Sequence, residues 1–295
     1  MRRSTSNGLL LLVAVIWGTT FVAQQLGMKD VGPLAYTGAR FLLGALCVLP
    51  LAWREYVRLH ERGIRIGSRD LLAWFGLGTL LFLGAIFQQV GVAGTSVSNA
   101  GFLTGLYVPL VPILGWWIDK HKPHFFVWPA TLGTLLGTFL LSGGDLKSLG
   151  EGDFWIIAST VFWASHVLYV GRVAAKKGAP IQVAFVQFVV CGVLSGIFAL
   201  GMETNTVAGM VQGLPAIMYA GVLSVGIAFT LQVVAQRHTH ATDAAILLSS
   251  EIVFAAIAAA IVLGERLSMT QWTGGALIFV CIVAVQIMPL WEKKA

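Results

Sequence analysis

Long apolar runs dominate the chain, and short polar segments separate them. A helix needs about 20 residues to cross the hydrocarbon core of a bilayer, at a rise of about 1.5 Å per residue. Ten runs meet that length, and the longest segment between them, 54–70, is too short for a soluble domain. The pattern predicts an all-α membrane protein whose function lies inside the helix bundle. The ten predicted spans are 8–28, 32–53, 71–93, 96–118, 124–142, 153–171, 180–201, 213–236, 241–264 and 269–290.

Composition strengthens this interpretation. Of the 295 residues, 57% are hydrophobic and 11% are charged, whereas soluble domains carry about 25% charged residues. The net charge of +6 would suit a nucleic-acid partner, but the basic residues lie in short loops between the apolar runs, which is a signal of membrane topology. We therefore expect membrane lipid, and no nucleic acid, around the protein. The three cysteines, all inside apolar runs, are expected to be free thiols.

The basic residues also predict the orientation. If both termini lie on one side, that side holds fifteen Lys and Arg residues, and the loops of the other side hold only Lys29, Lys147 and Arg266. Cytoplasmic loops retain the excess of Lys and Arg, so we expect both termini in the cytoplasm and an even number of spans. The first apolar run has no convincing cleavage site and is expected to remain as an uncleaved span.

An internal repeat is visible at a spacing of about 145 residues. Trp17 and Trp163 are 146 residues apart, and the prolines that open spans two and seven are 147 apart. At a spacing of 144, five residues of the first half meet identical residues in the second: Gln88, Val90, Thr95, Ala100 and Leu103. This agreement predicts two related units, 1–145 and 150–295.

Five spans in each unit make the repeat inverted. Because five is odd, the second unit enters the membrane in the opposite sense to the first. Inverted repeats are a recurring construction of secondary transporters, whose two halves exchange conformations around a shared central site. The organisation therefore favours a transporter that works by alternating access, and no enzymatic activity is expected.

Two charged residues lie deep in the apolar runs. Arg40 lies eight residues into span two and Glu251 ten residues into span nine, from opposite faces, so both reach roughly the midplane. A charge at that depth costs about 2.5–3.5 kcal/mol on insertion scales. Two interpretations stay open: structural ion pairs or snorkelling, or a solute site or gate. In the second, Glu251 is the candidate for a coupling proton, because a carboxylate in a low dielectric protonates readily.

A central cavity is predicted around these charges. Trp17, Thr20 and Gln24 form a polar stripe at helical spacing on span one, and the repeat pairs further residues across the two units. A tryptophan inside a span also occurs in ordinary packing, so each ring alone leaves both interpretations open. The residues expected to line the cavity are Trp17, Thr20, Gln24, Arg40, Tyr107, Trp163, His166, Gln187 and Glu251.

Proline and glycine mark the expected helix joints. Pro109 and Pro112 should kink or break span four, which predicts a hinge or a wall of the site. The pairs Gly101–Gly105, Gly133–Gly137 and Gly192–Gly196 predict close helix packing. The sequence contains no phosphate-binding loop, so ATP-driven pumping would require a partner. Neither a cofactor nor a metal site is expected, because the histidines near span ends are typical of interfacial positions.

Several segments resemble a known family. The segments Val15–Phe21, Ala39–Leu43, Leu248–Ala256 and Leu263–Ser268 are similar to those of the drug/metabolite transporter superfamily, specifically its ten-helix EamA-type exporters. The resemblance covers essentially the whole chain. It implies efflux of small metabolites, commonly amino acids, and a location in a bacterial inner membrane. The aromatic residues at the predicted site make aromatic and neutral amino-acid exporters the most similar group.

The chain also departs from the family pattern. Many relatives follow the glutamate of span nine with proline, whereas Ile252 stands here, so the resemblance alone does not predict a kink at that point. Two other functions stay open. A multidrug or cationic-solute exporter would use Glu251 as the counter-ion, although Arg40 favours a carboxylate-bearing solute. An intramembrane enzyme for lipid-linked substrates would need clustered His, Asp or Glu. No obligate protein partner is expected.

Overall fold

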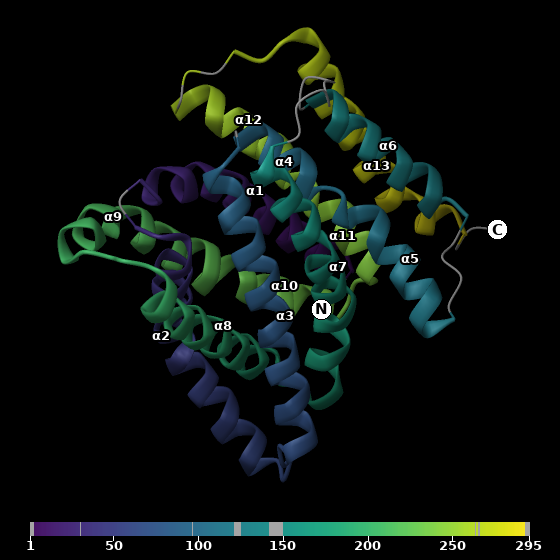
Figure 1. Ribbon diagram of the computed structural model, residues 1–295. Helices are drawn as coiled ribbons and strands as arrows, with labels where there is room; N and C mark the ends of the chain where they lie inside the picture. Colours follow the sequence, from purple (N-terminus) through teal and green to yellow (C-terminus); the bar gives the residue numbers. More distant parts are fainter. Residues whose placement is uncertain are drawn as a thin grey trace.

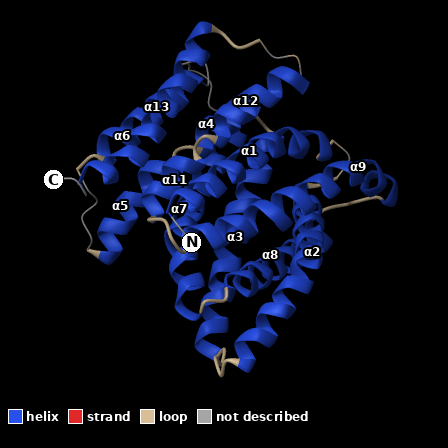
Figure 2. Ribbon diagram, turned by 180° about the vertical axis from the view of Figure 1, so that it is seen from behind, coloured by secondary structure: helices blue, strands red, loops and turns tan. Residues whose placement is uncertain are grey.

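The structure of the protein is a computed structural model. It describes residues 3–29, 31–95, 97–120, 125–141, 150–262, 264 and 266–292, and only the backbone of 98, 99, 119 and 285–292. All regular secondary structure in these residues is helical (Figure 2). Eight helical segments are long and apolar enough to cross a membrane, and two shorter apolar helices, Val127–Leu141 and Met269–Ala284, coincide with predicted spans five and ten. The ten predicted spans are therefore confirmed as helices.

Each repeat contains five spans, some of which are divided. In the first repeat the helices are α1 (Arg3–Gly27), α2 (Pro33–Glu61), α3 (Ser68–Ala93), α4 (Val97–Thr104), α5 (Tyr107–Asp119) and α6 (Val127–Leu141). In the second they are α7 (Glu151–Lys177), α8 (Pro180–Met202), α9 (Val207–Tyr219), η1 (Ala220–Phe229), α10 (Thr230–Gln236), α11 (Ala241–Leu248), α12 (Glu251–Val262) and α13 (Met269–Glu292).

The fourth span of each repeat is broken at the same place. α4 ends at Thr104 and α5 begins at Tyr107, while α11 ends at Leu248 and α12 begins at Glu251. The two breaks are 144 residues apart, which is the spacing of the identical residues in the sequence. The fourth spans of the two repeats are therefore interrupted, and begin again, at equivalent residues.

The break between α11 and α12 forms without proline. The hydroxyl of Ser249 donates to the carbonyl of Ile246 at 2.6 Å, and the hydroxyl of Ser250 donates to that of Leu247 at 2.7 Å. The hydroxyl of Ser249 thus gives the carbonyl of Ile246 a partner, and the carbonyl of Leu247 also accepts the backbone amide of Ser250 at 3.3 Å. Non-helical backbone at membrane depth requires such partners. The sequence left a kink at this point open; the break is present, and two adjacent serines occupy it.

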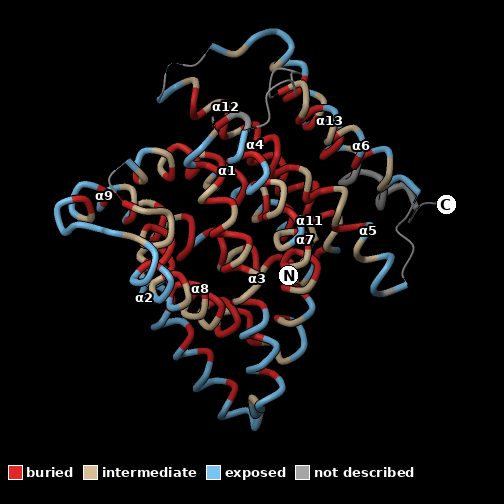
Figure 3. The backbone as a smooth tube through the Cα atoms, in the orientation of Figure 1, coloured by how far each residue is buried: buried red, intermediate tan, exposed pale blue. Residues whose placement is uncertain are grey.

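The two repeats interlock rather than lie side by side. α2 packs against α8 and α6 against α13, so equivalent helices meet across the repeat boundary. α1 packs on α12 and on α9, η1 and α10, while α7 packs on α3, α4 and α5. Figure 1 shows the α2–α3 turn and the α12–α13 connection at opposite ends of the bundle. Buried residues concentrate where the helices of both repeats cross (Figure 3).

Two glutamates tie the repeats together at opposite faces. Glu55, near the end of α2, accepts the backbone amides of Ile181 and Gln182 in the first turn of α8, both at 2.9 Å. Glu203, which follows α8, accepts the amides of Leu34 and Ala35 in the first turn of α2, at 2.7 and 2.9 Å. The first amides of a helix have no intrahelical acceptor and attract negative charge. Each repeat therefore caps a helix of the other.

Close approaches at glycines bring helices into direct contact. A Cβ on Gly18 would lie 2.5 Å from Cβ of Phe254 and 2.6 Å from the carbonyl of Glu251, because α1 lies directly against α12. A Cβ on Gly137 would lie 2.7 Å from the carbonyl of Gly274, between α6 and α13. Small residues at such contacts permit tight helix packing in lipid. Of the predicted glycine pairs, Gly133 and Gly137 both lie at such contacts, whereas a Cβ on Gly101 would lie 3.4 Å from its nearest neighbour and one on Gly196 would meet nothing within 4 Å.

The third span of the second repeat contains a wide helical turn. η1, Ala220–Phe229, is a π-helix between α9 and α10, whereas its counterpart α3 is a continuous α-helix over Ser68–Ala93. A π-helix shifts the hydrogen bonds from i→i+4 to i→i+5 and often marks a functional site. Here it lies opposite Trp17, at the centre of the bundle.

Candidate functional site

A small cavity of about 40 Å³ lies between the repeats. Each water needs about 10–15 Å³ of such volume, so the space would hold only a few waters. Helices of both repeats contribute to its wall. The lining residues are Trp17, Phe21, Gln24, Arg40, Gln88, Thr104, Tyr107, Trp163, Val167, Ser224, Phe229, Gln232 and Glu251.

The wall repeats the symmetry of the chain. Trp17 and Trp163 face the cavity from α1 and α7, and so do Phe21 and Val167 one turn further along the same helices. Two further pairs on the wall are equivalent at a spacing of 144 residues: Gln88 with Gln232, and Tyr107 with Glu251. The cavity therefore lies on the pseudo-symmetry axis, where an inverted-repeat transporter places its solute.

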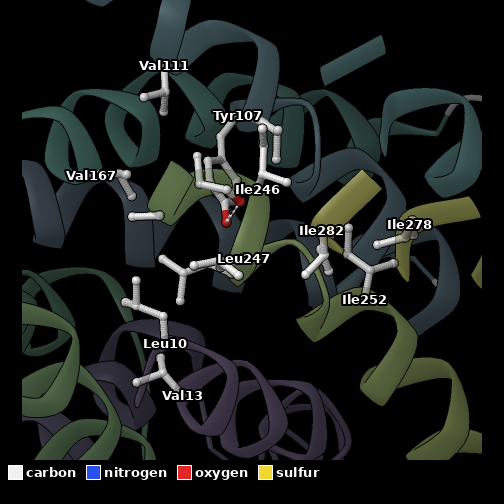
Figure 4. Close-up of a cluster of buried hydrophobic side chains, with 14 of the residues drawn as sticks. Leu10, Val13, Tyr107, Val111, Val167, Ile246, Leu247, Ile252, Ile278 and Ile282 are labelled. Atoms are coloured by element: carbon white, nitrogen blue, oxygen red, sulfur yellow. Dashed lines mark hydrogen bonds between the residues drawn. The ribbon is translucent and has the colours of Figure 1, made fainter. Parts of the chain in front are cut away.

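Tyr107 and Glu251 are the first residues after the two helix breaks. The phenol of Tyr107 donates to the carbonyl of Ala245 in α11 at 3.4 Å, across the repeat boundary (Figure 4). Glu251 is 5% exposed. Within the part of the chain that the structure describes, its carboxylate forms no hydrogen bond and no ion pair. The helix restart thus presents to the cavity a carboxylate that has no partner among the described residues.

Arg40 approaches the cavity from α2 and is also unpaired. It is 3% exposed, and no described residue bonds to its Nε. Its guanidinium carbon lies 5.6 Å from the ring centre of Tyr36 and 5.2 Å from that of Phe41, which is within the range of cation–π attraction. No ion pair joins Arg40 to any described carboxylate, so a positive and a negative group face one cavity separately.

Five aromatic residues form a large part of the remaining wall. The ring of Phe229 lies 4.5 Å from that of Trp17 and 6.0 Å from that of Trp163, centre to centre. The indole of Trp17 donates to the carbonyl of Ser224, in the π-helix, at 3.4 Å. Among the described residues nothing accepts from the indole of Trp163. The site therefore offers flat apolar surfaces and one free indole donor.

Six of the nine residues predicted to line the cavity lie on its wall, and three do not. The hydroxyl of Thr20 donates to the carbonyl of Ile16 in its own helix at 2.6 Å. The imidazole Nε2 of His166 and the amide oxygen of Gln187 lie 2.8 Å apart, and both side chains are fully buried behind the wall. The six on the wall are Trp17, Gln24, Arg40, Tyr107, Trp163 and Glu251.

The prolines of span four lie just after its break. The helix is interrupted at Gly105 and Leu106, Pro109 lies in the first turn of α5, and Pro112 lies inside it. The predicted break is present, and a hinge role for these residues stays a prediction. The structure does not describe Leu263 and Glu265 of the family-like segment, so their position lies outside the described residues.

Sequence reasoning missed other wall residues, the most informative being Gln88 and Gln232. Gln88 donates to the hydroxyl of Thr104 at 3.0 Å, and among the described residues the amide oxygen of Gln232 has no partner. Their signal was present: they are identical polar residues in apolar spans, separated by the repeat spacing. The remaining missed residues are Phe21, Thr104, Val167, Ser224 and Phe229.

Comparison with known proteins identifies the family. The model of the EamA-like transporter family matches the chain twice, over residues 5–143 and 150–286. This chain belongs to the EamA-like transporter family. It is therefore a multi-pass membrane protein of the drug/metabolite transporter superfamily, and the resemblance to that superfamily is confirmed. The similarity to aromatic and neutral amino-acid exporters in particular stays a prediction.

The EamA-like relatives are similar over nearly their whole length. An uncharacterized transporter of Archaeoglobus fulgidus is 29% identical over 94% of this chain and 84% of its own length. The uncharacterized transporter YwfM of Bacillus subtilis is 24% identical over 97% of this chain and 95% of its own. A solved crystal structure that is 18% identical superimposes over 100% of both chains with a TM-score of 0.79, which supports the fold.

Proposed function

We propose that this EamA-like protein is a secondary transporter of small zwitterionic metabolites, namely neutral and aromatic amino acids. The observation that carries the proposal is the presence on the wall of one cavity of Arg40 and Glu251, which are opposite in charge and form no ion pair within the described part of the chain. An unpaired charge in low dielectric is costly. An α-amino acid carries both complementary charges, so its carboxylate can pair with Arg40 and its ammonium with Glu251.

The aromatic wall supports the choice of side chain. Trp17, Trp163 and Phe229 surround the cavity, and aromatic surfaces favour a flat apolar side chain through stacking and area burial. The ammonium group would also gain cation–π attraction from the same rings. A polar or doubly charged amino acid would leave this surface poorly used.

Movement of the bundle must widen the cavity. A space of about 40 Å³ is smaller than an amino acid, so entry requires helices to separate. The breaks after Thr104 and Leu248 and the π-helix Ala220–Phe229 are joints where short helices can reorient. We propose alternating access, in which these joints open the cavity first to one face and then to the other.

Orientation and location form part of the proposal. The excess of Lys and Arg on the side of the chain ends supports cytoplasmic termini, and relatives such as YicL of Salmonella typhimurium are named as inner membrane transporters. We therefore place the protein in a bacterial-type cytoplasmic membrane. A protease-protected tag at either terminus of inverted vesicles would contradict this orientation.

Flux of matched analogues tests the proposal. Purified protein in liposomes receives radiolabelled phenylalanine, phenethylamine, which lacks the carboxylate, or hydrocinnamate, which lacks the ammonium. We expect phenylalanine to cross at least about tenfold faster than either analogue, since each lost charge-assisted contact is worth about 1.5–3 kcal/mol. If no amino acid crosses faster than in empty liposomes, the amino-acid proposal is wrong.

A cation exporter is the second candidate, and Glu251 favours it. A carboxylate among aromatic rings is a suitable counter-ion for an organic ammonium. In the same assay, phenethylamine would then cross faster than phenylalanine, and Arg40→Gln would increase its rate by removing the like charge. The opposite ranking of the two compounds excludes this alternative.

A further inference from the structure

A pocket of about 240 Å³ opens on the face of the bundle that carries the N-terminus. Arg3 pairs with Asp243 at 2.6 Å and Asn7 lies 3.4 Å from the hydroxyl of Thr239, which places the start of α1 beside this region. We call it the basic pocket. It is lined by Val167, Leu168, Gly171, Arg172, Ala175, Gln236, Arg237, Thr239, His240 and Ala241.

A second pocket, of about 450 Å³, lies at the far ends of α1 and α3. These are the helix ends furthest from the N-terminus, so this pocket opens toward the other face. We call it the opposite pocket. Its described lining residues are Gln25, Leu26, Met28, Lys29, Val92 and Ala93.

The basic pocket and the opposite pocket are lined by equivalent positions of the two repeats. On the first helix of each repeat, Arg172 is equivalent to Leu26 and Ala175 to Lys29, at a spacing of 146. On the third span, at a spacing of 144, the equivalents are Gln236 with Val92 and Arg237 with Ala93. Two unrelated surface hollows would have no reason to fall at equivalent positions on opposite faces.

The basic pocket adjoins the central cavity through one side chain. Val167 lines both spaces, and Gln232 of the cavity lies one turn before Gln236 of the pocket on α10. The equivalent of Val167 is Phe21, which lines the cavity but is absent from the described wall of the opposite pocket. A valine therefore separates the spaces on one side, and a phenylalanine on the other.

The two pockets differ in charge. Within the described residues the Nε of Arg237 has no partner, and neither does the amide oxygen of Gln236, which is 4% exposed. Arg237 forms no ion pair with a described carboxylate; the nearby Glu55 already binds the first amides of α8. Arg172 also lines the pocket and stacks on Tyr169 at 5.7 Å. The opposite pocket has one basic residue, Lys29, among its described wall.

We propose that the two pockets are the ends of the transport path, and that the basic pocket is a second solute site in which Arg237 and Gln236 receive the carboxylate and ammonium of the solute. The assignment rests on the proposed function. Val167 is the residue that the solute passes between this site and the central cavity. The polar residues of the opposite pocket, Gln25 and the exposed Lys29, have no buried atom that lacks a partner among the described residues, so this pocket releases the solute and does not hold it.

Transport kinetics measured with the solute presented at one face test the second solute site. Substituting Arg237→Gln should raise the KM for phenylalanine presented at the N-terminal face by about tenfold, the value of one charge-assisted hydrogen bond. Phenethylamine, which lacks the carboxylate, should show no rise. The control Arg62→Gln removes an exposed positive charge from the same face, outside the pocket. An unchanged KM for phenylalanine, or an equal rise for both compounds, overturns the proposed site.

Thiol labelling tests the path without any transport assay. In a background where Cys47, Cys191 and Cys281 are replaced by serine or alanine, Val167→Cys should react with a membrane-impermeant thiol reagent from the N-terminal face only. The control Ala174→Cys lies fully buried on the same helix, outside the pocket, and should not react. No labelling of Val167→Cys in folded protein overturns the path. If Val167→Cys is labelled but the same protein transports no amino acid in liposomes, the path is retained and the proposed substrate is rejected.

Discussion

The two repeats share their framework and differ in the side chains that face the cavity. Both have five spans, a fourth span broken at equivalent residues, and a central tryptophan on the first helix. Yet Tyr107 of the first repeat is equivalent to Glu251 of the second, and Arg40 is equivalent to Gln187, which lies behind the wall. The comparison teaches that duplication provides the common framework, while the substitutions between the two copies provide the chemistry of the cavity wall.

The backbone differs as well. α3 is a regular helix, whereas the equivalent span contains the π-helix Ala220–Phe229. The carbonyl of Ser224 in that segment accepts from the indole of Trp17 at 3.4 Å, and the equivalent tryptophan, Trp163, has no such acceptor in the described structure. The two tryptophans are therefore held differently, although the sequence makes them look alike.

Removing either cavity charge should have the largest effect. Glu251→Gln and Arg40→Gln each delete one charge-assisted contact to a zwitterion, worth about 1.5–3 kcal/mol. We expect the rate of phenylalanine uptake at low concentration to fall by about 100-fold. Uptake in proteoliposomes measures it. The control Asp70→Asn removes a carboxylate that pairs with Lys176 near the N-terminal face. An equal fall in the uptake rate in all three variants would contradict a specific role of the two cavity charges.

Exchanging glycine and alanine at equivalent positions on α1 and α7 should destabilise the protein to different extents. Gly18→Ala places a Cβ 2.5 Å from Cβ of Phe254, and such overpacking typically costs about 1–3 kcal/mol. The second repeat has Ala164 at this position, fully buried. We expect a lowered unfolding temperature in detergent for Gly18→Ala. The reciprocal Ala164→Gly should cost less, and equal shifts would show that the α1–α12 contact is not specially tight.

The two helix caps should contribute similar, independent stabilities. Glu55→Gln and Glu203→Gln each weaken the acceptor for two amides, and loss of a cap costs about 0.5–2 kcal/mol. Because the caps lie at opposite faces, their effects on unfolding temperature should add. Exposed Glu61, at the end of α2, provides the control Glu61→Gln. Strong non-additivity would mean that the caps act as one unit.

Exchanging the residues between cavity and pockets should have the smallest effect. Val167→Phe gives both repeats the same bulky side chain, and Phe21→Val gives both the smaller one. We expect Val167→Phe to slow exchange of labelled phenylalanine from the N-terminal face by about tenfold, since overpacking costs about 1–3 kcal/mol and each 1.4 kcal/mol corresponds to about a factor of ten. Phe21→Val should accelerate exchange from the other face, and no change in either variant would remove these residues from the path.

The sequence predicted the framework better than the orientation of individual side chains. Hydropathy and the 144-residue spacing located the spans and the equivalence of Tyr107 and Glu251, because lipid burial and symmetry act on whole helices. The sequence misplaced Thr20, since its hydroxyl bonds to its own helix and the rotation of α1 is set by packing against α12. The break at Ser249 and Ser250 carries no proline, and only the finished hydrogen bonds reveal it.

The reciprocal glutamates have a consequence for biosynthesis. α2 is completed early in translation, but the carboxylate that caps its start belongs to Glu203 and is made only after the ribosome has added more than 140 further residues. Until then, the nascent α2 must rely on water or lipid headgroups at that end. A gene split between the repeats would therefore yield two fragments that each contain an uncapped helix, and each fragment would become fully folded only after meeting the other.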